Sequence, residues 1–498
     1  EMQRSLVGSE MCIRDRYGIG DFGKGAYDFI NFLTGAGQSL WQILPLGHTG
    51  YGDSPYQAFS AFAGQPLLIS PDELIKDGLL YGDDLRDYPH FNPDHIYYGD
   101  VIPAKLRILH RSYEIFKESA DLCMLKEFDV FCEHEKDWLD DYALFMAGKD
   151  AHGGACWLEW EDDLRDPDEE IKATWRERLA DSIEYYKYIQ FIFFRQWNAI
   201  RDYAHVNGIK IVGDIPIFVA LDSADVWANR ELFQLEKDGY PTVVAGVPPD
   251  YFSATGQLWG NPLYDWDYHK KTHYDWWMRR IKGQLNMVDY IRVDHFRGFE
   301  QYYAIPYGEE TAMHGKWKKG PNEDLFLRMQ EVFGKDLPIW AEDLGIITPR
   351  VEKLRDDFNL PGMKVLQFAF GGGSDNEYLP HNYTQNAVVY PGTHDNETLM
   401  QYLDCAQDHV RNHIREYMNR PHASNGELCE NLIWMAMSSV GKYCIVPIQD
   451  YLGLGKEARM NFPSTLGHNW EWRVRKEQLT HDLAGNIAHM TGLSYRWR

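Results

Sequence analysis

Acidic and basic side chains follow several short apolar segments of this 498-residue chain. They are Asp214 after IVG, Arg292 and Asp294 in YIRVD, Glu342 and Asp343 after IWA, and His394 and Asp395 after AVVYPGT. An ionised carboxylate is costly to bury unless it is paired. At the end of an apolar strand it belongs either to a structural ion pair, such as Arg292 with Asp294, or to a site. The stretch around Asp294 alone leaves both possibilities open.

The number of such groups favours a site. Groups at the same end of successive parallel strands would converge on one cleft. Several carboxylates with two basic groups, and no cysteine–histidine metal pattern, favour glycoside chemistry. That chemistry needs one carboxylate as nucleophile and a second, protonated one as acid, and a third can hold sugar hydroxyls. A neighbouring arginine lowers the pKa of the nucleophile, and burial raises that of the acid.

The elements that must position these groups are short apolar segments alternating with helical ones, which predict a parallel sheet covered on both faces. The segments with strand character are Trp41–Leu46, Ile209–Ile215, Val288–Asp294, Pro338–Glu342, Met363–Phe368, Ala387–Tyr390 and Tyr443–Val446. One more strand would close a (β/α)8 barrel, also called a TIM barrel. The missing strand would be the first, at the position of residues 1–16.

Residues 1–16 do not suit that position. Their apolar residues come in the short clusters Leu6-Val7 and Met11-Cys12-Ile13, whereas a buried parallel strand needs a continuous apolar run. The stretch SLVGSEMCIRDR resembles a translated sequencing adaptor rather than a protein segment. We therefore expect a non-native segment that lies outside the barrel or fills the first-strand position poorly, with the catalytic barrel in residues 17–498.

Two insertions are expected in the barrel. Good helix formers dominate residues 70–205, above all Leu106–Leu125, Asp129–Met146 and Asp168–Tyr203, which predicts a mainly helical subdomain. It could face the substrate or only buttress the barrel. Residues 246–265 have neither helix nor strand periodicity, which is typical of a lid over a site. A packed surface loop is the alternative.

Composition excludes several classes of function. The net charge of −25, from 75 acids and 50 bases, disfavours nucleic acid and anionic membranes as partners. No apolar run approaches the roughly 20 residues of a membrane span. The seven cysteines form no C-x-x-C pair, which disfavours zinc and fits reduced thiols in the cytoplasm. The aromatic content of 14% suits ligands with flat C–H faces edged by hydroxyls, such as sugars.

Long motifs in order along the chain resemble those of the 4-α-glucanotransferases of glycoside hydrolase family 77 (amylomaltase or disproportionating enzyme) in the α-amylase clan. The motifs are LPLGHTGYGDSPYQAFSAFAG, GDIPIFVALDSADVWAN, GVPPDYFSATGQLWGNPLYDW, RVDHFRGF, WAEDLGIITPRV, PGMKVLQFAF, GTHDNET and RMNFPST. The resemblance runs from about Tyr17 to Arg473. It implies a (β/α)8 barrel without the C-terminal β-sandwich of α-amylases.

The resemblance also implies roles for particular residues. Asp294 would be the nucleophile, Glu342 the acid/base and Asp395 the transition-state stabiliser. The further substrate-binding residues that it implies are Asp214, Arg292 and His394 around the reacting sugar, Tyr56 near the scissile bond, Asn461 in RMNFPST, Tyr51 at a second glucan-contact site, and Asp250, Phe252, Gln257 and Trp259 in the lid. A packed surface loop remains an alternative for Gln257.

Two positions depart from the family pattern. The family opens with a strand and a proline-containing turn, which residues 1–16 do not match. His48 stands where the family commonly has proline, and we assign it no role because a lone histidine beside a site is more often a hydrogen-bonded loop residue.

The expected reaction is transfer of an α-1,4-glucan segment to the 4-hydroxyl of an acceptor, through a covalent glycosyl-enzyme and with net retention. Donors and acceptors would be maltooligosaccharides, starch or glycogen chains and glucose, and no cofactor is expected. An α-1,4-glucan hydrolase is the alternative in the same class. A non-catalytic glucan-binding protein would be expected to lack one of the three carboxylates, and all three are present.

We predict that catalysis needs no metal ion, because the carboxylates are required for covalent and acid/base work and no His or Cys ligand cluster accompanies them. Activity should survive dialysis against EDTA undiminished. Loss of activity that one particular divalent ion restores would contradict this prediction.

Overall fold

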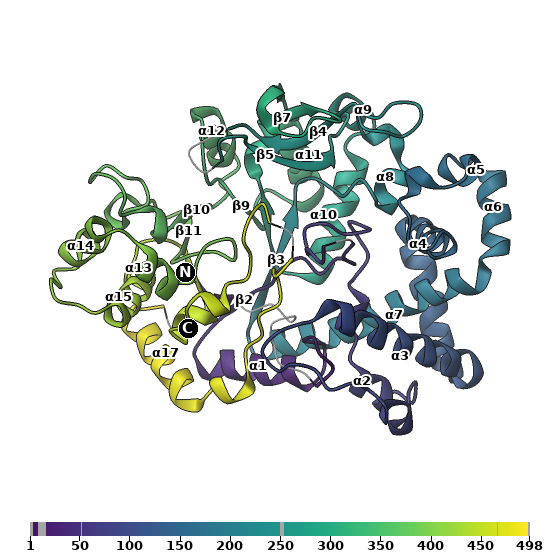
Figure 1. Cartoon of the computed structure of the whole chain (residues 1–498), viewed down its shortest axis with the longest axis horizontal. Coiled ribbons are helices and arrows are strands. Elements are labelled where there is room, and N and C mark those ends of the chain that lie inside the picture. Colours follow the sequence, from purple (N-terminus) through teal and green to yellow (C-terminus); the bar gives the residue numbers. More distant parts are fainter. Residues whose placement is uncertain (1–2, 8–15, 51, 250–252, 466, 497–498) are drawn as a thin grey trace.

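A closed barrel of parallel strands lies at the centre of the molecule, as the sequence predicted (Figure 1). The computed structural model describes residues 3–7, 16–50, 52–249, 253–465 and 467–496. Around the barrel the strands are β1 (Gln3–Val7), β12 (Tyr443–Pro447), β11 (Ala387–Tyr390), β10 (Gly362–Val365), β9 (Ile339–Ala341), β6 (Tyr290–Asp294), β3 (Lys210–Pro216) and β2 (Leu40–Gln42). The predicted (β/α)8 fold class is therefore confirmed.

The first barrel strand corrects an expectation from the sequence. β1 pairs in parallel with β12 on one side and with β2 on the other. The expectation that residues 1–16 lie outside the barrel is therefore wrong for Gln3–Val7. Pairing on both sides satisfies the backbone of this strand, and a closed barrel leaves no open edge. Met11–Asp15 lie outside the described residues, and a poor fit of this segment stays a prediction.

Helices surround the barrel and connect its strands. They are α1 (Lys24–Gly35), α7 (Ala180–Val206), α10 (Asp275–Met287), α11 (Glu323–Phe333), α12 (Pro349–Asp357), α13 (Leu399–Cys405), α14 (Asp408–Tyr417), α15 (Asn425–Met437), α16 (Ile448–Tyr451) and α17 (His481–Leu493). Local chemistry fixes where they begin. The Thr348 side chain accepts from the amide of Val351 and Pro349 opens α12, while Ser424 and Glu427 form a capping box at α15.

Apolar side chains from successive strands fill the barrel interior. They include Leu40, Val212, Trp340, Met363, Val365, Val388, Tyr390, Tyr443 and Ile445. Leu40, Trp340 and Tyr390 are each less than 2% exposed. The interior is thus a packed core and not a pore, so chemistry is confined to the rim where the strands end.

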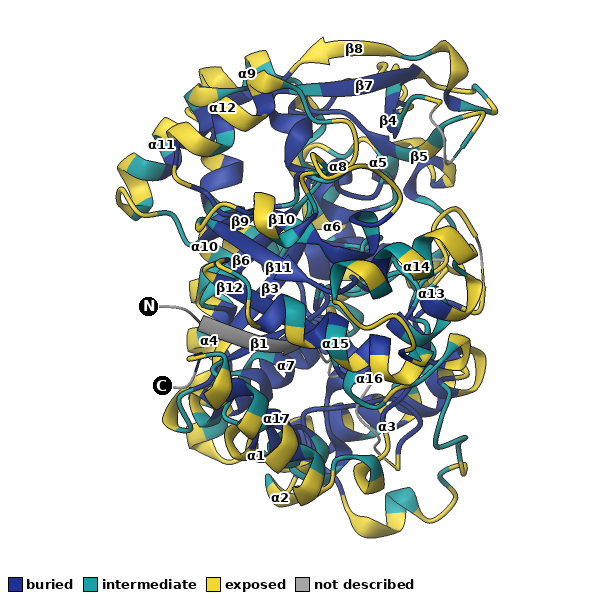
Figure 2. Cartoon of the chain, turned by 90° about the vertical axis from the view of Figure 1, so that its left-hand side faces the viewer, coloured by how far each residue is buried: buried dark blue, intermediate teal, exposed yellow. Residues whose placement is uncertain are grey.

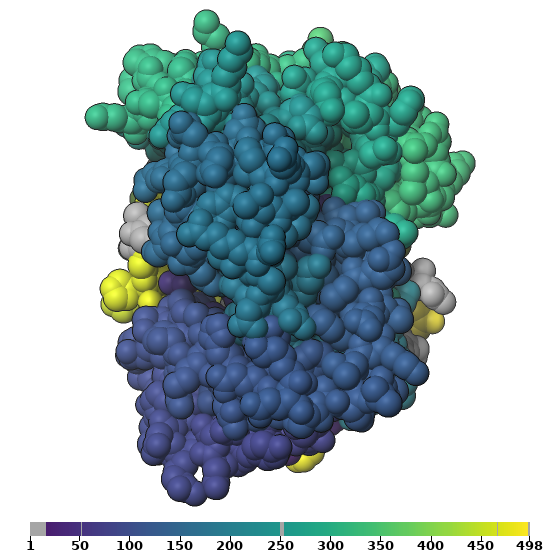
Figure 3. Space-filling model, turned by 90° about the vertical axis from the view of Figure 1, so that its right-hand side faces the viewer, coloured from purple at the N-terminus to yellow at the C-terminus, as the bar shows by residue number. Residues whose placement is uncertain are grey.

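Between β2 and β3 the chain is helical and covers one side of the molecule. Its helices are α2 (Pro71–Lys76), α3 (Tyr98–Ser119), α4 (Leu122–Ala151), α5 (Asp162–Arg165), α6 (Glu169–Arg178) and the long α7. The helix-forming stretch Leu106–Leu125 is divided between α3 and α4, because the carboxylate of Asp121 accepts from the amide of Met124 at 2.8 Å and starts α4. Figure 3 shows these segments, in blue, over much of this face. Their assignment as a separate subdomain stays a prediction.

A second, antiparallel sheet lies beyond the end of the barrel and was not predicted. Its strands, in the order β5 (Gln257–Pro262), β4 (Val243–Val247), β7 (Gln301–Pro306) and β8 (Lys316–Lys319), lie at the top of Figures 1 and 2. The expectation that residues 246–265 lack strand structure is therefore wrong for residues 246–247, which end β4, and for residues 257–262, which form β5. A Cβ at Gly246 would lie 2.2 Å from the carbonyl oxygen of Gln257, so the close approach of β4 and β5 requires glycine there. Short helices α8 (Ala224–Ala228) and α9 (Trp266–Lys271) flank β4 and β5 in sequence.

Two further features match the sequence analysis. In the described residues after β12, helices α16 and α17 are the regular elements other than short 3₁₀ turns, and no β-sandwich domain forms. None of the helices in the described ranges is both long and apolar enough to cross a membrane.

We predict that the first strand limits stability, because Gln3, Arg4 and Ser5 occupy a strand position that favours apolar β-branched residues. Replacing these three residues with Val-Ile-Val should raise the thermal midpoint and the soluble yield. If the thermal midpoint and the soluble yield stay unchanged, apolar residues are not needed at positions 3–5. The prediction that this segment fills the first-strand position poorly would then be refuted.

Candidate active site

Strand register places the two principal carboxylates side by side. In the pairing of β6 with β9, Val293 lies opposite Ala341, so the next residues, Asp294 and Glu342, leave the barrel at the same level. Neighbouring strands lie about 4.7–4.9 Å apart, which is close to the roughly 5–5.5 Å carboxyl separation of retaining glycosidases. The strand count from the sequence, which put these residues on neighbouring strands, is confirmed.

A buried arginine holds two of the carboxylates. Nη1 of Arg292 donates to both oxygens of Asp214, at 2.8 and 2.6 Å, and Nη2 donates to Oδ1 of Asp294 at 2.9 Å. Asp214 and Arg292 are only 2% and 3% exposed. Burial alone would lower the pKa of Arg292, but the charges of Asp214 and Asp294 raise it well above its usual value. The guanidinium therefore stays charged and orients Asp294 toward the cleft.

Glu342 sits in a different environment from Asp294. Its Oε2 accepts from the backbone amide of His295 at 2.7 Å, and its Oε1 accepts from that of Leu344 at 2.8 Å. His295 adopts the left-handed conformation (φ 57°), which brings its amide to this carboxyl. Burial, reinforced by the charge of Asp294, raises the pKa of Glu342 to about 8 against the opposing effect of Arg292. Glu342 is thus protonated at neutral pH, as an acid catalyst must be.

Aromatic rings form one wall beside Asp214. The hydroxyl of Tyr56 donates to Oδ2 of Asp214 at 3.0 Å and lies 2.9 Å from Nε2 of His394. The Tyr56 and His394 rings stack with centroids 5.5 Å apart, and each lies 5.8 Å from the ring of Trp470. Burial raises the pKa of Tyr56 well above its usual value, so its hydroxyl keeps the proton that it donates.

Asp395 adjoins the aromatic wall through His394 and is held by the C-terminal segment. Nδ2 of Asn461 donates to Oδ1 of Asp395 at 2.7 Å, and Nη2 of Arg459 donates to the backbone oxygen of Asp395 at 3.1 Å. Nε2 of His394 lies 3.5 Å from Oδ2 of Asp395. The Asp395 side chain remains 44% exposed, so one face of its carboxylate is open to a ligand.

These groups surround a cleft of about 630 Å³. Its lining includes Asp294, His295 and Asp395 from the barrel rim, Tyr56 and Gln57 from the loop after β2, Gln257 and Trp259 from β5, and Asn461, Phe462 and Trp470 from the C-terminal segment. Glu342, Arg292 and Asp214 lie behind this surface, linked to it by the contacts above. The volume falls in the usual range for a ligand pocket.

The lid residues are placed only in part. Trp259 donates from Nε1 to the side-chain oxygen of Gln257 at 3.1 Å, and its ring meets His295 edge-on with centroids 4.8 Å apart. Both residues line the cleft, and their contact with substrate stays a prediction. Tyr51, Asp250 and Phe252 lie outside the described residues.

Sequence reasoning missed some residues of the cleft. Trp470 is 3% exposed and adopts a left-handed backbone, and nothing in NWEWR signals its place behind Tyr56. His295 was visible beside Asp294 but received no role. His48 lies with Nδ1 2.8 Å from the hydroxyl of Tyr142 on α4, and its ring meets that of Phe59 edge-on.

The arrangement can perform double displacement at a glycosidic bond. One carboxylate is hydrogen-bonded to arginine, burial raises the pKa of a neighbouring carboxyl, and a third carboxylate lines the same aromatic-walled cleft. Among the described residues, no group of three or more acidic, histidine or cysteine side chains is placed to hold a metal ion. Barrel and site together define an enzyme that acts on glycosidic bonds.

Comparison with known proteins narrows this class. The family model described as 4-alpha-glucanotransferase, glycoside hydrolase family 77, matches residues 10–480. The chain therefore belongs to the 4-alpha-glucanotransferases of family 77, and the resemblance stated from the motifs is confirmed.

Relatives and solved structures agree with this assignment. The chain is 47% identical to a 4-alpha-glucanotransferase of Synechocystis sp. over 480 residues, which cover 96% of this chain and 95% of that one. It is 46% identical to one of Thermus thermophilus over 485 residues, covering 96% of each. Amylomaltase from Streptococcus agalactiae, solved in complex with acarbose, superposes with a TM-score of 0.96 at 37% identity over the whole of both chains.

We predict that Glu342→Gln stabilises the fold increasingly as the pH rises. Since the pKa of Glu342 is raised from 4.5 to about 8, ionising it costs folding free energy as the pH rises through this range. The thermal midpoint of the variant should exceed that of wild type by about three to four degrees more at pH 9 than at pH 5, because each unit of pKa shift is worth about 1.4 kcal/mol and roughly three units of the shift fall between these two pH values.

The exposed Glu310→Gln serves as the control and should show no pH-dependent difference. If the gap for Glu342→Gln stays constant over this range, Glu342 is not held protonated by its surroundings.

Proposed function

We propose that this chain transfers segments of α-1,4-glucans between glucan chains, using Asp294 as nucleophile and Glu342 as acid and base. The observation that carries the proposal is the contrast between the neighbouring side chains of Asp294 and Glu342. Asp294 accepts a hydrogen bond from the charged Arg292 at 2.9 Å, whereas burial raises the pKa of Glu342 to about 8.

In the first half-reaction, Asp294 attacks the anomeric carbon of the donor sugar. The bond to the leaving glucan breaks as Glu342 gives its proton to the glycosidic oxygen. A glycosyl ester on Asp294 results, and Glu342 is left ionised. Arg292 favours this step because its hydrogen bond holds the Asp294 carboxylate in place before attack.

In the second half-reaction, the 4-hydroxyl of an acceptor glucan attacks the same carbon. Glu342 takes the hydroxyl proton, the ester bond breaks and Asp294 leaves as a carboxylate. Two inversions give net retention. The open carboxylate face of Asp395 is placed to hold sugar hydroxyls, which strengthens binding where the ring is distorted in the transition state.

Stacking supports glucan as the substrate. Tyr56, Trp259, Phe462 and Trp470 line the cleft, and aromatic rings pack on the apolar faces of glucose. Maltooligosaccharides, starch or glycogen chains and glucose are the donors and acceptors that we infer. The six cysteines in the described residues are free thiols, which supports a cytoplasmic location.

Incubation with maltotriose tests the reaction type. A ladder of shorter and longer maltooligosaccharides with free glucose is expected. Maltose and glucose alone would identify a hydrolase, and unchanged maltotriose would identify a binding protein.

We predict that Asp294→Asn keeps the fold and loses roughly ten-thousand-fold or more in kcat, because an amide cannot form the ester intermediate. Product chromatography measures the rate, and thermal melting checks the fold. The exposed Asp336→Asn is the matched control and should retain full activity.

Retention of even a tenth of wild-type activity, in a preparation shown by mass spectrometry to be free of deamidated protein, would exclude Asp294 as the nucleophile.

A further inference from the structure

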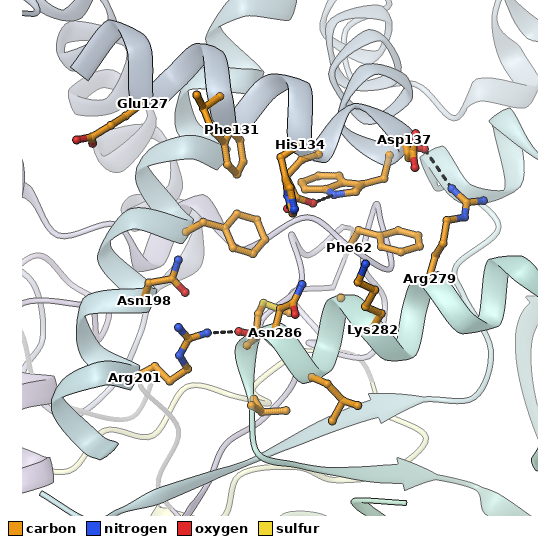
Figure 4. A pocket seen from close by; sticks show the side chains of 18 of the residues that line it. Phe62, Glu127, Phe131, His134, Asp137, Asn198, Arg201, Arg279, Lys282 and Asn286 are labelled. Atoms are coloured by element: carbon orange, nitrogen blue, oxygen red, sulfur yellow. Dashed lines mark hydrogen bonds and ion pairs between the residues drawn. The ribbon is translucent and has the colours of Figure 1, made fainter. Parts of the chain in front are cut away.

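A second cavity, of about 1000 Å³, lies away from the cleft (Figure 4). Its walls come from helices α4, α7 and α10 and from the loop that carries Phe62. Val288 and Asp289, which line it, precede β6, whereas the catalytic groups follow the strands. The cavity is therefore on the flank of the barrel toward the opposite ends of its strands.

Half-buried aromatic rings form a continuous surface in this cavity. Phe62 stacks on Trp138 with centroids 6.2 Å apart and planes 13° from parallel. Trp138 lies 6.0 Å from Phe194, which lies 5.8 Å from Phe131. Each of these rings leaves part of its surface accessible. Flat aromatic faces of this kind suit ligands that present C–H groups.

Uncommitted polar side chains border the aromatic surface. Asn198, Lys282 and Asn286 line the cavity, and within the described chain their side chains make no hydrogen bond or ion pair. Glu135 accepts from Nε1 of Trp138 at 2.5 Å and lies 2.7 Å from Nδ1 of His134. The rim thus offers amide and ammonium groups to a ligand rich in hydroxyls.

The permanent positive and negative charges that line the cavity are equal in number. The basic lining residues with permanent charge are Lys126, Arg201, Arg279 and Lys282, and the acidic ones are Glu127, Glu135, Asp137 and Asp289. Several are already engaged: Arg195 pairs with Glu127, and His205 lies 2.9 Å from Asp289. A phosphate or a polyanion would find no excess of positive charge here. The cavity favours a neutral ligand with apolar faces and hydroxyl edges.

We propose that this cavity binds a segment of α-1,4-glucan independently of the catalytic cleft. The inference rests on the proposed function, since the enzyme would then meet glucan polymers larger than its cleft. The cavity and the cleft share no lining residue, so a chain bound in the cavity leaves the cleft free. The cavity anchors the enzyme on a large glucan and raises the local concentration of chain ends at the cleft.

Paired substitutions separate this site from general effects on the fold. Phe131→Leu keeps apolar volume but removes a flat face, and Phe333→Leu makes the same change on the far helix α11. Gly283→Leu fills the cavity, because a Cβ at Gly283 meets only the ring of Phe62, at 3.5 Å. Gly485→Leu is its control, on an open helical surface with no atom within 4 Å of the new Cβ.

The experiment is equilibrium dialysis against labelled maltoheptaose, with every variant made on the Asp294→Asn background so that the ligand is not consumed. We expect Phe131→Leu and Gly283→Leu each to bind one molecule fewer per chain than the background, and the two controls to bind the same number. Thermal melting confirms folding, and Gly283→Leu keeps the test valid if Phe131→Leu unfolds, since it removes no contact.

An unchanged number of bound molecules in Gly283→Leu would overturn the proposal. A second result would also overturn the proposal. If sedimentation shows a concentration-dependent dimer that Gly283→Leu abolishes while the amount of bound glucan stays the same, the cavity holds a second copy of the chain. Incubation of the unsubstituted chain with maltotriose tests the proposed function separately. If a ladder of maltooligosaccharides forms but Gly283→Leu binds as many maltoheptaose molecules as its background, only the second binding site is refuted.

Discussion

The buried guanidinium of Arg292 is the interaction on which the site depends. It lies between Asp214 and Asp294, on the strand that ends in Asp294, and its charge is enclosed by protein. Removing one partner of a buried pair costs about 3–5 kcal/mol, because the remaining charge is left uncompensated. The trio is therefore kept together by its own electrostatics. Asp214 serves in it as the second counter-charge and as the acceptor for Tyr56.

The same arrangement gives the neighbouring carboxyls of Asp294 and Glu342 different hydrogen-bond partners. Arg292 donates to Asp294, while Glu342 receives only neutral backbone amides. Two groups on adjacent strands thus meet different electrostatic surroundings, and in the mechanism that we propose the roles of acid and nucleophile follow from position rather than from residue type. The left-handed backbone at His295 contributes to this difference, since it turns an amide toward Glu342 directly after Asp294.

Much of the barrel and the core of the site could be predicted from sequence for physical reasons. Strands such as Ala387–Tyr390 are unbroken apolar runs. Asp294 ends β6 and Glu342 directly follows β9, so their convergence follows from parallel topology. Trp470 could not be placed, because only tertiary packing brings it to Tyr56. β4 and β5 were missed because their pairing depends on glycine and proline positions that weaken strand periodicity. The first strand was misjudged because its polar residues argued against a pairing that barrel closure nevertheless provides.

The pairing of β1 with β12 has a consequence for the newly made chain. β1 leaves the ribosome more than 430 residues before Tyr443–Pro447, one of its two partner strands. At about 5–20 residues per second, β1 waits roughly 20 seconds or longer with one edge unpaired. Asn461, which holds Asp395, emerges later still. Until these segments emerge, the nascent protein has an open sheet edge and an incomplete site, and that edge is exposed to pairing with other chains.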